Sequence, residues 1–200
     1  STSEGIAFNS DGTQMYITGI SSGYVYQYTL STAFDLSTAS YNNVRLIVAF
    51  DDNEPEGLNF NTNGTKMYVV GNQNNSVYQY SLTTAFDLST ASYDNVSFSV
   101  SGQDTQPSGI TFNNDGTKMY IVGNDSDSVH QYSLSTAFDL STASYDSVFF
   151  DVSGQESTSE GIAFNSDGTQ MYIIGSLTDD FVHQYTTSKE ALVLGTGSFA

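Results

Sequence analysis

The fold of this chain is decided by residues 56–71, which read Glu-Gly-Leu-Asn-Phe-Asn-Thr-Asn-Gly-Thr-Lys-Met-Tyr-Val-Val-Gly. The pattern recurs at residues 4–19, 108–123 and 160–175, so each copy begins 52 residues after the previous one. A fixed period of this size is typical of one supersecondary unit repeated in tandem. The period therefore predicts a repeat architecture before any other feature is considered.

The composition indicates a β-rich protein of one domain. The 200 residues include 14 Tyr and 13 Phe but no Trp, and aromatic and β-branched side chains suit the pleated, packed surface of a sheet. There is no cysteine, so the redox compartment cannot be inferred from disulfides. No apolar run approaches the roughly 20 residues that a membrane helix needs, which argues against membrane insertion.

The charge balance restricts the partners. There are 22 acidic and 4 basic residues, for a formal net charge of −18. Such a surface repels nucleic acid and anionic membranes. A cationic partner, a metal ion or a neutral glycan remains compatible with it. The scarcity of lysine also suits an extracellular or salty setting.

Each repeat is expected to form four strands. In the second repeat they are predicted at residues 57–61, 67–71, 77–82 and 96–100. Asn63 and Gly64 lie between the first two, and the other repeats have Asp-Gly there. Asn-Gly and Asp-Gly are strong hairpin signals because both turn positions tolerate positive φ. The alternating fourth strand is predicted to be half-exposed.

A connector, Phe-Asp-Leu-Ser-Thr-Ala-Ser-Tyr, precedes the fourth strand. It spans residues 86–93 and recurs verbatim at 34–41 and 138–145. Its Phe, Leu and Tyr are expected to fold back onto the blade edge, while Asp87 bonds locally to Ser89 and Thr90 and fixes a turn or short helical start. Alternatively, the aromatic side chains face outward and form a periodic row for sugar or protein binding.

Tandem meanders of four antiparallel strands predict an all-β propeller of four blades. The blades are expected at residues 4–55, 56–107, 108–159 and 160–200, with the first strand of each at the axis and the fourth outside. The last repeat lacks the connector, and residues 191–194 are interpreted as a shortened outer strand or one exchanged with a neighbouring molecule. Two such chains combining into an eight-bladed ring is the alternative closure.

Residues 1–17 are identical to residues 157–173. Circular closure would bring these two copies side by side, and repeats this similar suggest recent duplication from a longer array. Because the chain opens directly into a repeat, we expect either that a signal peptide has been removed or that this is a piece of a longer protein.

Residues 5–17, Gly-Ile-Ala-Phe-Asn-Ser-Asp-Gly-Thr-Gln-Met-Tyr-Ile, resemble the inner hairpin of YVTN, NHL and gluconolactonase-like propeller repeats. With the connector included, the unit is similar to tandem repeats of marine bacterial surface and phage tail-associated proteins. The resemblance covers essentially the whole chain. It implies a propeller but no particular activity, because propellers host many functions.

The residue before the first-strand glycine is acidic in three repeats, as Glu4, Glu56 and Glu160, whereas the third repeat has Ser108. In a closed propeller these positions meet at one mouth of the axial channel, where like charges raise each other's pKa or hold a cation such as Ca²⁺. In gluconolactonase-like enzymes a glutamate before the equivalent glycine is a metal ligand. Ser108 interrupts the ring, and those enzymes normally have six blades. Solvated acids at the channel rim are the alternative.

Two further sets of residues are predicted to be structural. The turn acids Asp11, Asp115 and Asp167 resemble fragments of a calcium loop, but Asn63 replaces them in the second repeat, which indicates turn chemistry. The two histidines occupy the third-strand position that Tyr26 and Tyr78 fill in the other repeats. They are His130 and His183. We interpret both as residues of a packing or surface position rather than as a catalytic pair.

The sequence favours a non-enzymatic extracellular repeat module, because near-identical repeats present no singular site and no catalytic residue is assigned. It would serve as an adhesion, filament or interaction scaffold on a cell or virion surface, with a protein or glycan partner or with itself. The alternatives are a metal-dependent lactonase-like hydrolase, whose cofactor would be Ca²⁺ at Glu4, Glu56 and Glu160, and a carbohydrate-binding propeller.

Overall fold

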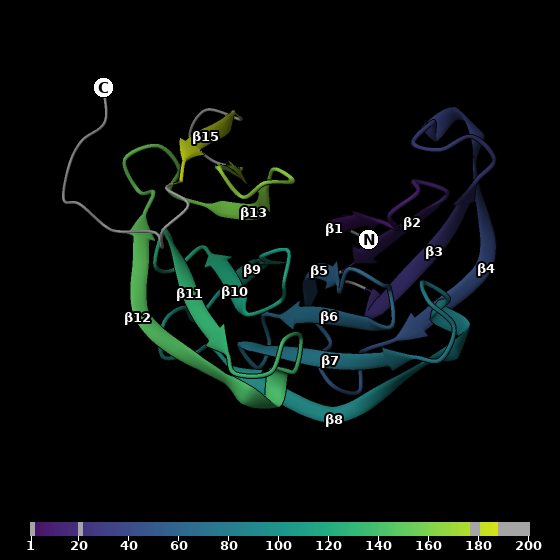
Figure 1. The fold of residues 1–200 in the computed structure, drawn as a ribbon, viewed down its shortest axis with the longest axis horizontal. Helices are drawn as coiled ribbons and strands as arrows, with labels where there is room; N and C mark the ends of the chain where they lie inside the picture. The colour runs from purple at the N-terminus through teal and green to yellow at the C-terminus, as the bar shows by residue number, and fades with distance from the viewer. Residues whose placement is uncertain (1–2, 20–21, 177–180, 188–200) are drawn as a thin grey trace.

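The computed structural model describes residues 3–19, 22–176 and 181–187. It confirms the predicted all-β propeller of four blades arranged around a common axis (Figure 1). Three blades are four-stranded antiparallel sheets, and the described part of the fourth blade has three strands. The predicted outer strand at residues 191–194 lies outside the described residues. None of the helices in the described part is long and apolar enough to cross a membrane.

The strands follow the repeat. Blade 1 contains β1 (Ser3–Phe8), β2 (Gln14–Gly19), β3 (Tyr24–Leu30) and β4 (Ala39–Ile47). Blade 2 contains β5 (Pro55–Phe60), β6 (Lys66–Gly71), β7 (Ser76–Leu82) and β8 (Ala91–Ser99). Blade 3 contains β9 (Pro107–Phe112), β10 (Lys118–Gly123), β11 (Ser128–Leu134) and β12 (Ala143–Asp151). Blade 4 contains β13 (Ser159–Phe164), β14 (Gln170–Gly175) and β15 (Val182–Thr186).

Within every blade the strands pair in sequence order, as a meander does. The first strands pack against one another from blade to blade, β1 on β5, β5 on β9 and β9 on β13. The fourth strands β4, β8 and β12 lie on the outside (Figure 1). The predicted inner and outer positions are therefore confirmed.

The hairpin turns have the predicted chemistry. Asn63 Oδ1 accepts hydrogen bonds from the backbone N–H of Thr65 at 3.1 Å and from its hydroxyl at 2.6 Å. Asp115 makes the same pair to Thr117 at 2.9 and 2.5 Å. Gly64 follows with φ +72°, where side chains are strained, and a Cβ there would lie 2.2 Å from the Phe86 ring. The turn acids are thus turn formers, as predicted.

The connector contains the expected short helical turn. Asp87 caps a 3₁₀ helix, η3 (Leu88–Thr90), and accepts from the Ser89 N–H at 2.9 Å. The helices η2 (Leu36–Thr38) and η4 (Leu140–Thr142) are equivalent. The predicted start of the fourth strand was wrong: β8 begins at Ala91, inside the connector. The longer strand is accommodated by an irregularity in the register between β7 and β8 beside Gln79, where Asn95 has φ 56° and the additional residues of β8 bulge out of the pairing.

The hydrophobic core is divided among the junctions between blades. One cluster joins blades 1 and 2, a second joins blades 2 and 3, and a third joins blades 3 and 4. Tyrosines fill the first two junctions. Tyr16 packs on Phe60 with ring centroids 4.6 Å apart, and Tyr68 packs on Phe112 at 4.5 Å. The blades are therefore held together by repeated face-to-face packing of sheets.

Candidate functional site

The predicted acids lie around the axis, where β1, β5, β9 and β13 meet. Glu56 is buried, and its pKa is raised to about 7, first by burial and then by the charges of Glu4 and Glu160. Burial and the charge of Glu160 also raise the pKa of Glu4. A cavity of about 560 Å³ opens here, and Glu4, Glu160 and the apolar side chain of Ile110 help to line it. The three glutamates therefore share one electrostatic environment.

Two of the residues at these positions make hydrogen bonds to neighbouring groups. The hydroxyl of Ser108 donates to the backbone oxygen of Ser159 at 2.5 Å, so it is engaged with the neighbouring strand. Glu160 accepts a hydrogen bond from the Ser176 hydroxyl at 3.1 Å. In the part of the chain that the structure describes, no group of three or more His, Cys, Asp or Glu side chains is placed to hold a metal ion. Calcium binding at Glu4, Glu56 and Glu160 therefore stays a prediction.

The histidines occupy packing positions. His130 is buried on β11, with Nε2 2.9 Å from the Ser126 hydroxyl and its ring centroid 5.9 Å from that of Tyr145. Burial lowers the pKa of His130. His183 lies on β15, one blade away. His130 is thus a packing residue, and the two histidines lie on separate blades.

The most distinctive polar contact joins neighbouring blades. The side-chain oxygen of Gln27 in blade 1 accepts the backbone N–H of Leu88, in the connector of blade 2, at 2.9 Å. Gln79 accepts the N–H of Leu140 in blade 3 at 2.8 Å in the same way. Both leucines are buried. The connector of one blade is therefore bound by the preceding blade.

A tyrosine supports each of these contacts. The Tyr16 hydroxyl donates to the Phe86 carbonyl oxygen at 2.5 Å, and the Tyr68 hydroxyl donates to that of Phe138 at 2.5 Å. Both tyrosine side chains are fully buried. Each connector thus contributes a backbone donor and a backbone acceptor, and both are satisfied by the preceding blade as burial requires.

The glutamine amides are held in one orientation. The amide nitrogen of Gln79 donates to Asp94 at 2.8 Å, so its oxygen must face the next blade. In blade 1 the nitrogen of Gln27 donates instead to the side-chain oxygen of Gln14 at 3.1 Å. An amide whose nitrogen is already engaged presents a preorganised acceptor. The amide oxygen is thus held in the orientation that the connector N–H requires.

This contact corrects the predicted position of the connector. The ring of Phe86 does fold onto its own blade, 5.4 Å from that of Phe60, as expected. Leu88, however, packs across the junction, where η3 contacts β4 of the preceding blade. The glutamines were not identified from the sequence. The available signal was a glutamine near the centre of every third strand, between a Tyr or His and a Tyr, at Gln27, Gln79, Gln131 and Gln184.

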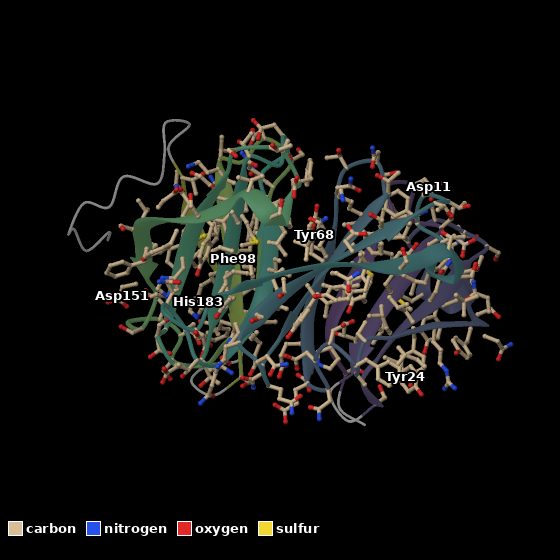
Figure 2. All side chains as sticks on the ribbon, turned by 90° about the horizontal axis from the view of Figure 1, so that it is seen from below. Asp11, Tyr24, Tyr68, Phe98, Asp151 and His183 are labelled. Atoms are coloured by element: carbon tan, nitrogen blue, oxygen red, sulfur yellow. The ribbon has the colours of Figure 1, made fainter. Side chains whose placement is uncertain are left out.

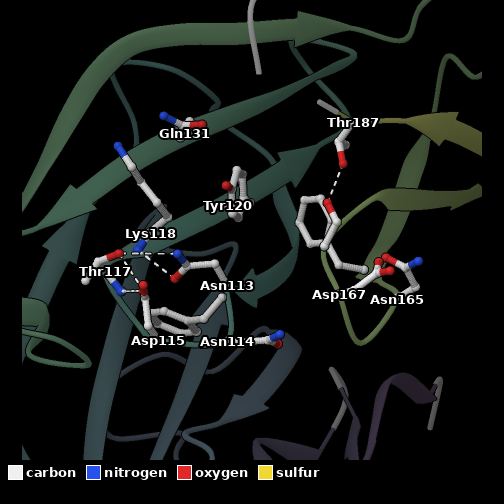
Figure 3. Close-up of a pocket in the computed structure, with 13 residues that line it drawn as sticks. Asn113, Asn114, Asp115, Thr117, Lys118, Tyr120, Gln131, Asn165, Asp167 and Thr187 are labelled. Carbon is white, nitrogen blue, oxygen red and sulfur yellow. Dashed lines mark hydrogen bonds between the residues drawn. The ribbon is translucent and has the colours of Figure 1, made fainter. Parts of the chain in front are cut away.

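At the junction of blades 3 and 4 the described residues line a cleft (Figure 3). Its volume is about 490 Å³, and its lining includes Tyr120, Gln131 and Phe164. These correspond to the residues that bind the connector at the first two junctions, and the fourth repeat lacks the connector sequence. Gln131 is oriented as before, because its nitrogen donates to Asp146 at 2.7 Å. The cleft combines aromatic faces with fixed polar groups.

No protein-family model matches the sequence, and a search of curated proteins gives no match. Solved structures do match. A protein provisionally named a 6-phosphogluconolactonase from Bacteroides uniformis superposes with a TM-score of 0.64 at 12% identity, covering 96% of this chain and 52% of that one. The periplasmic gluconolactonase of Pseudomonas aeruginosa gives 0.62 at 11%, covering 95% and 51%. A chain of a nidogen–laminin complex gives 0.57 at 15%, covering 86% and 56%.

These likenesses establish the fold and leave the activity open. The chain is a β-propeller whose structural neighbours include gluconolactonase-like propellers. It spans about half the length of the solved structures that it matches. At this level of identity one fold accommodates enzymes and binding proteins alike.

Proposed function

We propose that this chain is a non-enzymatic repeat module that acts as an interaction scaffold. The observation that carries the proposal is the repeated inter-blade contact. Its glutamine, tyrosine and connector leucine serve to bind one blade to the next. Because these repeated residues bind one blade to the next, they are suited to assembling blades rather than to catalysing a reaction.

The proposal places the scaffold outside the cell, on a cell or virion surface. The net charge of −18 supports this setting, because a strongly acidic surface stays soluble at high ionic strength and does not bind nucleic acid. The partner is a protein surface or a glycan. The cleft between blades 3 and 4 favours a glycan as a second ligand, since the Tyr120 and Phe164 rings lie beside the oriented amide of Gln131.

A lactonase-like hydrolase is the competing function. Its support is the names of the structural neighbours and the three axial glutamates. The described residues offer that enzyme no metal ligand set, and Ser108 is turned to the backbone. We therefore rank it second.

Hydrolysis of gluconolactone, measured with Ca²⁺ and with EDTA, tests the choice. The scaffold predicts no turnover above the uncatalysed rate in either condition. Calcium-dependent turnover that Glu56→Gln abolishes would overturn it and support the hydrolase. The matched control is Glu54→Gln, which removes a nearby glutamate that does not precede a first-strand glycine.

A further inference from the structure

We propose that Asp127 is a pH-dependent fastening residue in the loop between β10 and β11 of blade 3. When its carboxyl is protonated, it donates a hydrogen bond to a backbone oxygen of this loop or of residues 152–158, the link that leads into blade 4. When the carboxyl is ionised, that hydrogen bond is lost. The attachment of blade 4 to blade 3 then responds to pH, a property that the proposed scaffold function does not require.

Blade 2 shows what this position does when it carries an amide. Asn75 occupies it, in the loop between β6 and β7. The amide nitrogen of Asn75 donates to the backbone oxygen of Asn72, in the same loop, at 2.7 Å. It also donates at 2.7 Å to the backbone oxygen of Thr105, in the link that leads into blade 3. Because an amide nitrogen carries two protons, both bonds form at once and fasten the loop to the link.

The backbone around Asp127 has the same geometry as the backbone around Asn75. The residue number differs by the repeat period of 52, and φ is 50° at Asn75 and 46° at Asp127. The backbone oxygen of Asn75 accepts the N–H of Val100 at 2.9 Å, and that of Asp127 accepts the N–H of Val152 at 2.9 Å. The side chain of Asp127 therefore begins where the side chain of Asn75 begins in blade 2.

An ionised carboxylate cannot make the contacts of that amide. The acceptors that correspond to those of Asn75 are the backbone oxygens of Asn124 and Ser157, and a carboxylate has no proton to donate to them. Within residues 3–19, 22–176 and 181–187, Oδ1 of Asp127 is a buried atom with no hydrogen-bond partner. Buried polar atoms are rarely left in this state. Protonation gives the carboxyl one donor, which replaces part of what Asn75 supplies.

Neighbouring charges favour the protonated form. Burial raises the pKa of Asp127 most, and the charges of four further acids raise it more, in the order Asp104, Asp151, Glu156 and Asp125. They come from the link into blade 3, the end of β12, the link into blade 4 and the same loop. Figure 2 shows Asp151 at the end of the molecule that also carries His183 of blade 4.

The remaining titratable group beside this loop is His130 on β11. Its Nε2 lies 2.9 Å from the hydroxyl of Ser126, which donates to Asp104 at 2.6 Å. Burial lowers the pKa of His130 from its ordinary value of 6.5, so the ring is neutral above that pH and does not offset the acids. Blade 2 has Gln73, Asn75 and Ser99 where blade 3 has Asp125, Asp127 and Asp151, so the acidic surroundings are absent from its loop.

The sign of the pH dependence follows from proton linkage. The folded chain holds the proton of Asp127 more tightly than the unfolded chain, where the ordinary pKa is 3.8. The stabilisation is therefore complete below about pH 3.8 and is lost as the pH rises through the raised folded-state pKa. The loop is fastened in acid and released toward neutral pH.

NMR titration of the side-chain carboxyl carbons in EDTA tests the proton directly in the wild type. The range of about pH 4.5 to 8 lies above the isoelectric point of about 4.1. Asp127 is expected to titrate within this range, and the backbone amides of residues 124–127 and 152–158 are expected to shift with the same midpoint. An Asp127 that is already ionised at pH 4.5, or amides that do not follow it, would overturn the proposal.

Exchanging the two residues between blades gives the second arm. Asp127→Asn should raise Tm by roughly 2–4 °C at pH 8, with a gain that shrinks toward pH 4.5, and Asn75→Asp should lower Tm at pH 8 with a loss that shrinks in the same way. The matched control is Asp125→Asn, which makes the same change of charge in the same loop and keeps an oxygen for the Thr105 hydroxyl, now 2.7 Å away. It should leave the pH dependence of Tm unchanged.

Two results of this arm would contradict the proposal. Equal gains from Asp127→Asn and Asp125→Asn at pH 8 would reduce the effect to general charge repulsion. Stabilisation of the wild type by Ca²⁺ at pH 8, abolished by Asp127→Asn, would make a metal ion rather than a proton the ligand of this carboxyl. Gains specific to Asp127→Asn, with the opposite change from Asn75→Asp, support the pH-dependent contact.

Discussion

Replacing Glu56 with glutamine should stabilise the protein above neutral pH and have little effect in acid. The Glu56 carboxyl has an ordinary pKa of 4.5 and a folded-state pKa of about 7. The difference between these two pKa values, at about 1.36 kcal/mol per pKa unit, sets an upper limit of roughly 3 kcal/mol on the destabilisation by the ionised carboxylate. Solvent near the axial cavity screens this charge, so we expect about 1–2 kcal/mol.

The direction follows from proton linkage. Below about pH 4.5 the carboxyl is protonated in the folded and the unfolded chain, and its neutral form is tolerated. Between about pH 4.5 and 7 the unfolded chain releases the proton while the folded chain retains it, so the wild type loses stability as the pH rises. Glutamine does not titrate. The advantage of Glu56→Gln should therefore grow through this window and level off above about pH 7.

Thermal unfolding in EDTA at about pH 4 and pH 8 measures this difference, and about 1–2 kcal/mol corresponds to roughly 2–8 °C for a chain of this size. Asp115→Asn is the control, because hydrogen bonds from Thr117 lower the pKa of Asp115 and its contribution is lost as the pH falls. The second repeat carries Asn63 at this position. A gain from Glu56→Gln that is equal at both pH values, or a loss at pH 8, would refute the assignment of a buried, repelled carboxyl.

Two further predictions concern the connector. Leu140→Ala should lower the free energy of unfolding by about 2–5 kcal/mol, because it empties a fully buried site between blades 2 and 3. Leu36→Ala in dilute, monomeric protein should lower it by less than about 0.5 kcal/mol, because Leu36 is exposed. Equal effects of the two substitutions in urea titrations would contradict the blade-to-blade role of the connector. Gly64→Ala should destabilise the protein by about 1–3 kcal/mol more than Gly168→Ala. Both glycines have φ near +72°, but of the two only a Cβ at residue 64 meets a phenylalanine ring. Equal losses of stability in calorimetry would show that the contact with Phe86 does not cause the difference.

The local part of the fold was predictable from the sequence. The Asn-Gly and Asp-Gly turns, the alternation of the inner and outer strands and the Asp87 cap all depend on residues within a few positions of one another. The period of 52 residues then required each unit to repeat its neighbour. The start of β8 was missed because Asn95 and the irregularity beside Gln79 arise from pairing between strands rather than from local propensity.

The relation between blades was decided only by the tertiary structure. Gln27 binds Leu88 across 61 residues, and Tyr16 binds Phe86 across 70 residues. The repeat shows that these residue types recur, but not which copy meets which. The same holds for Glu56, whose raised pKa depends on the walls that bury it and on two glutamates from other blades. Turns and strands are specified by short-range sterics and hydrogen bonding, whereas burial and charge repulsion depend on where distant segments come together in space.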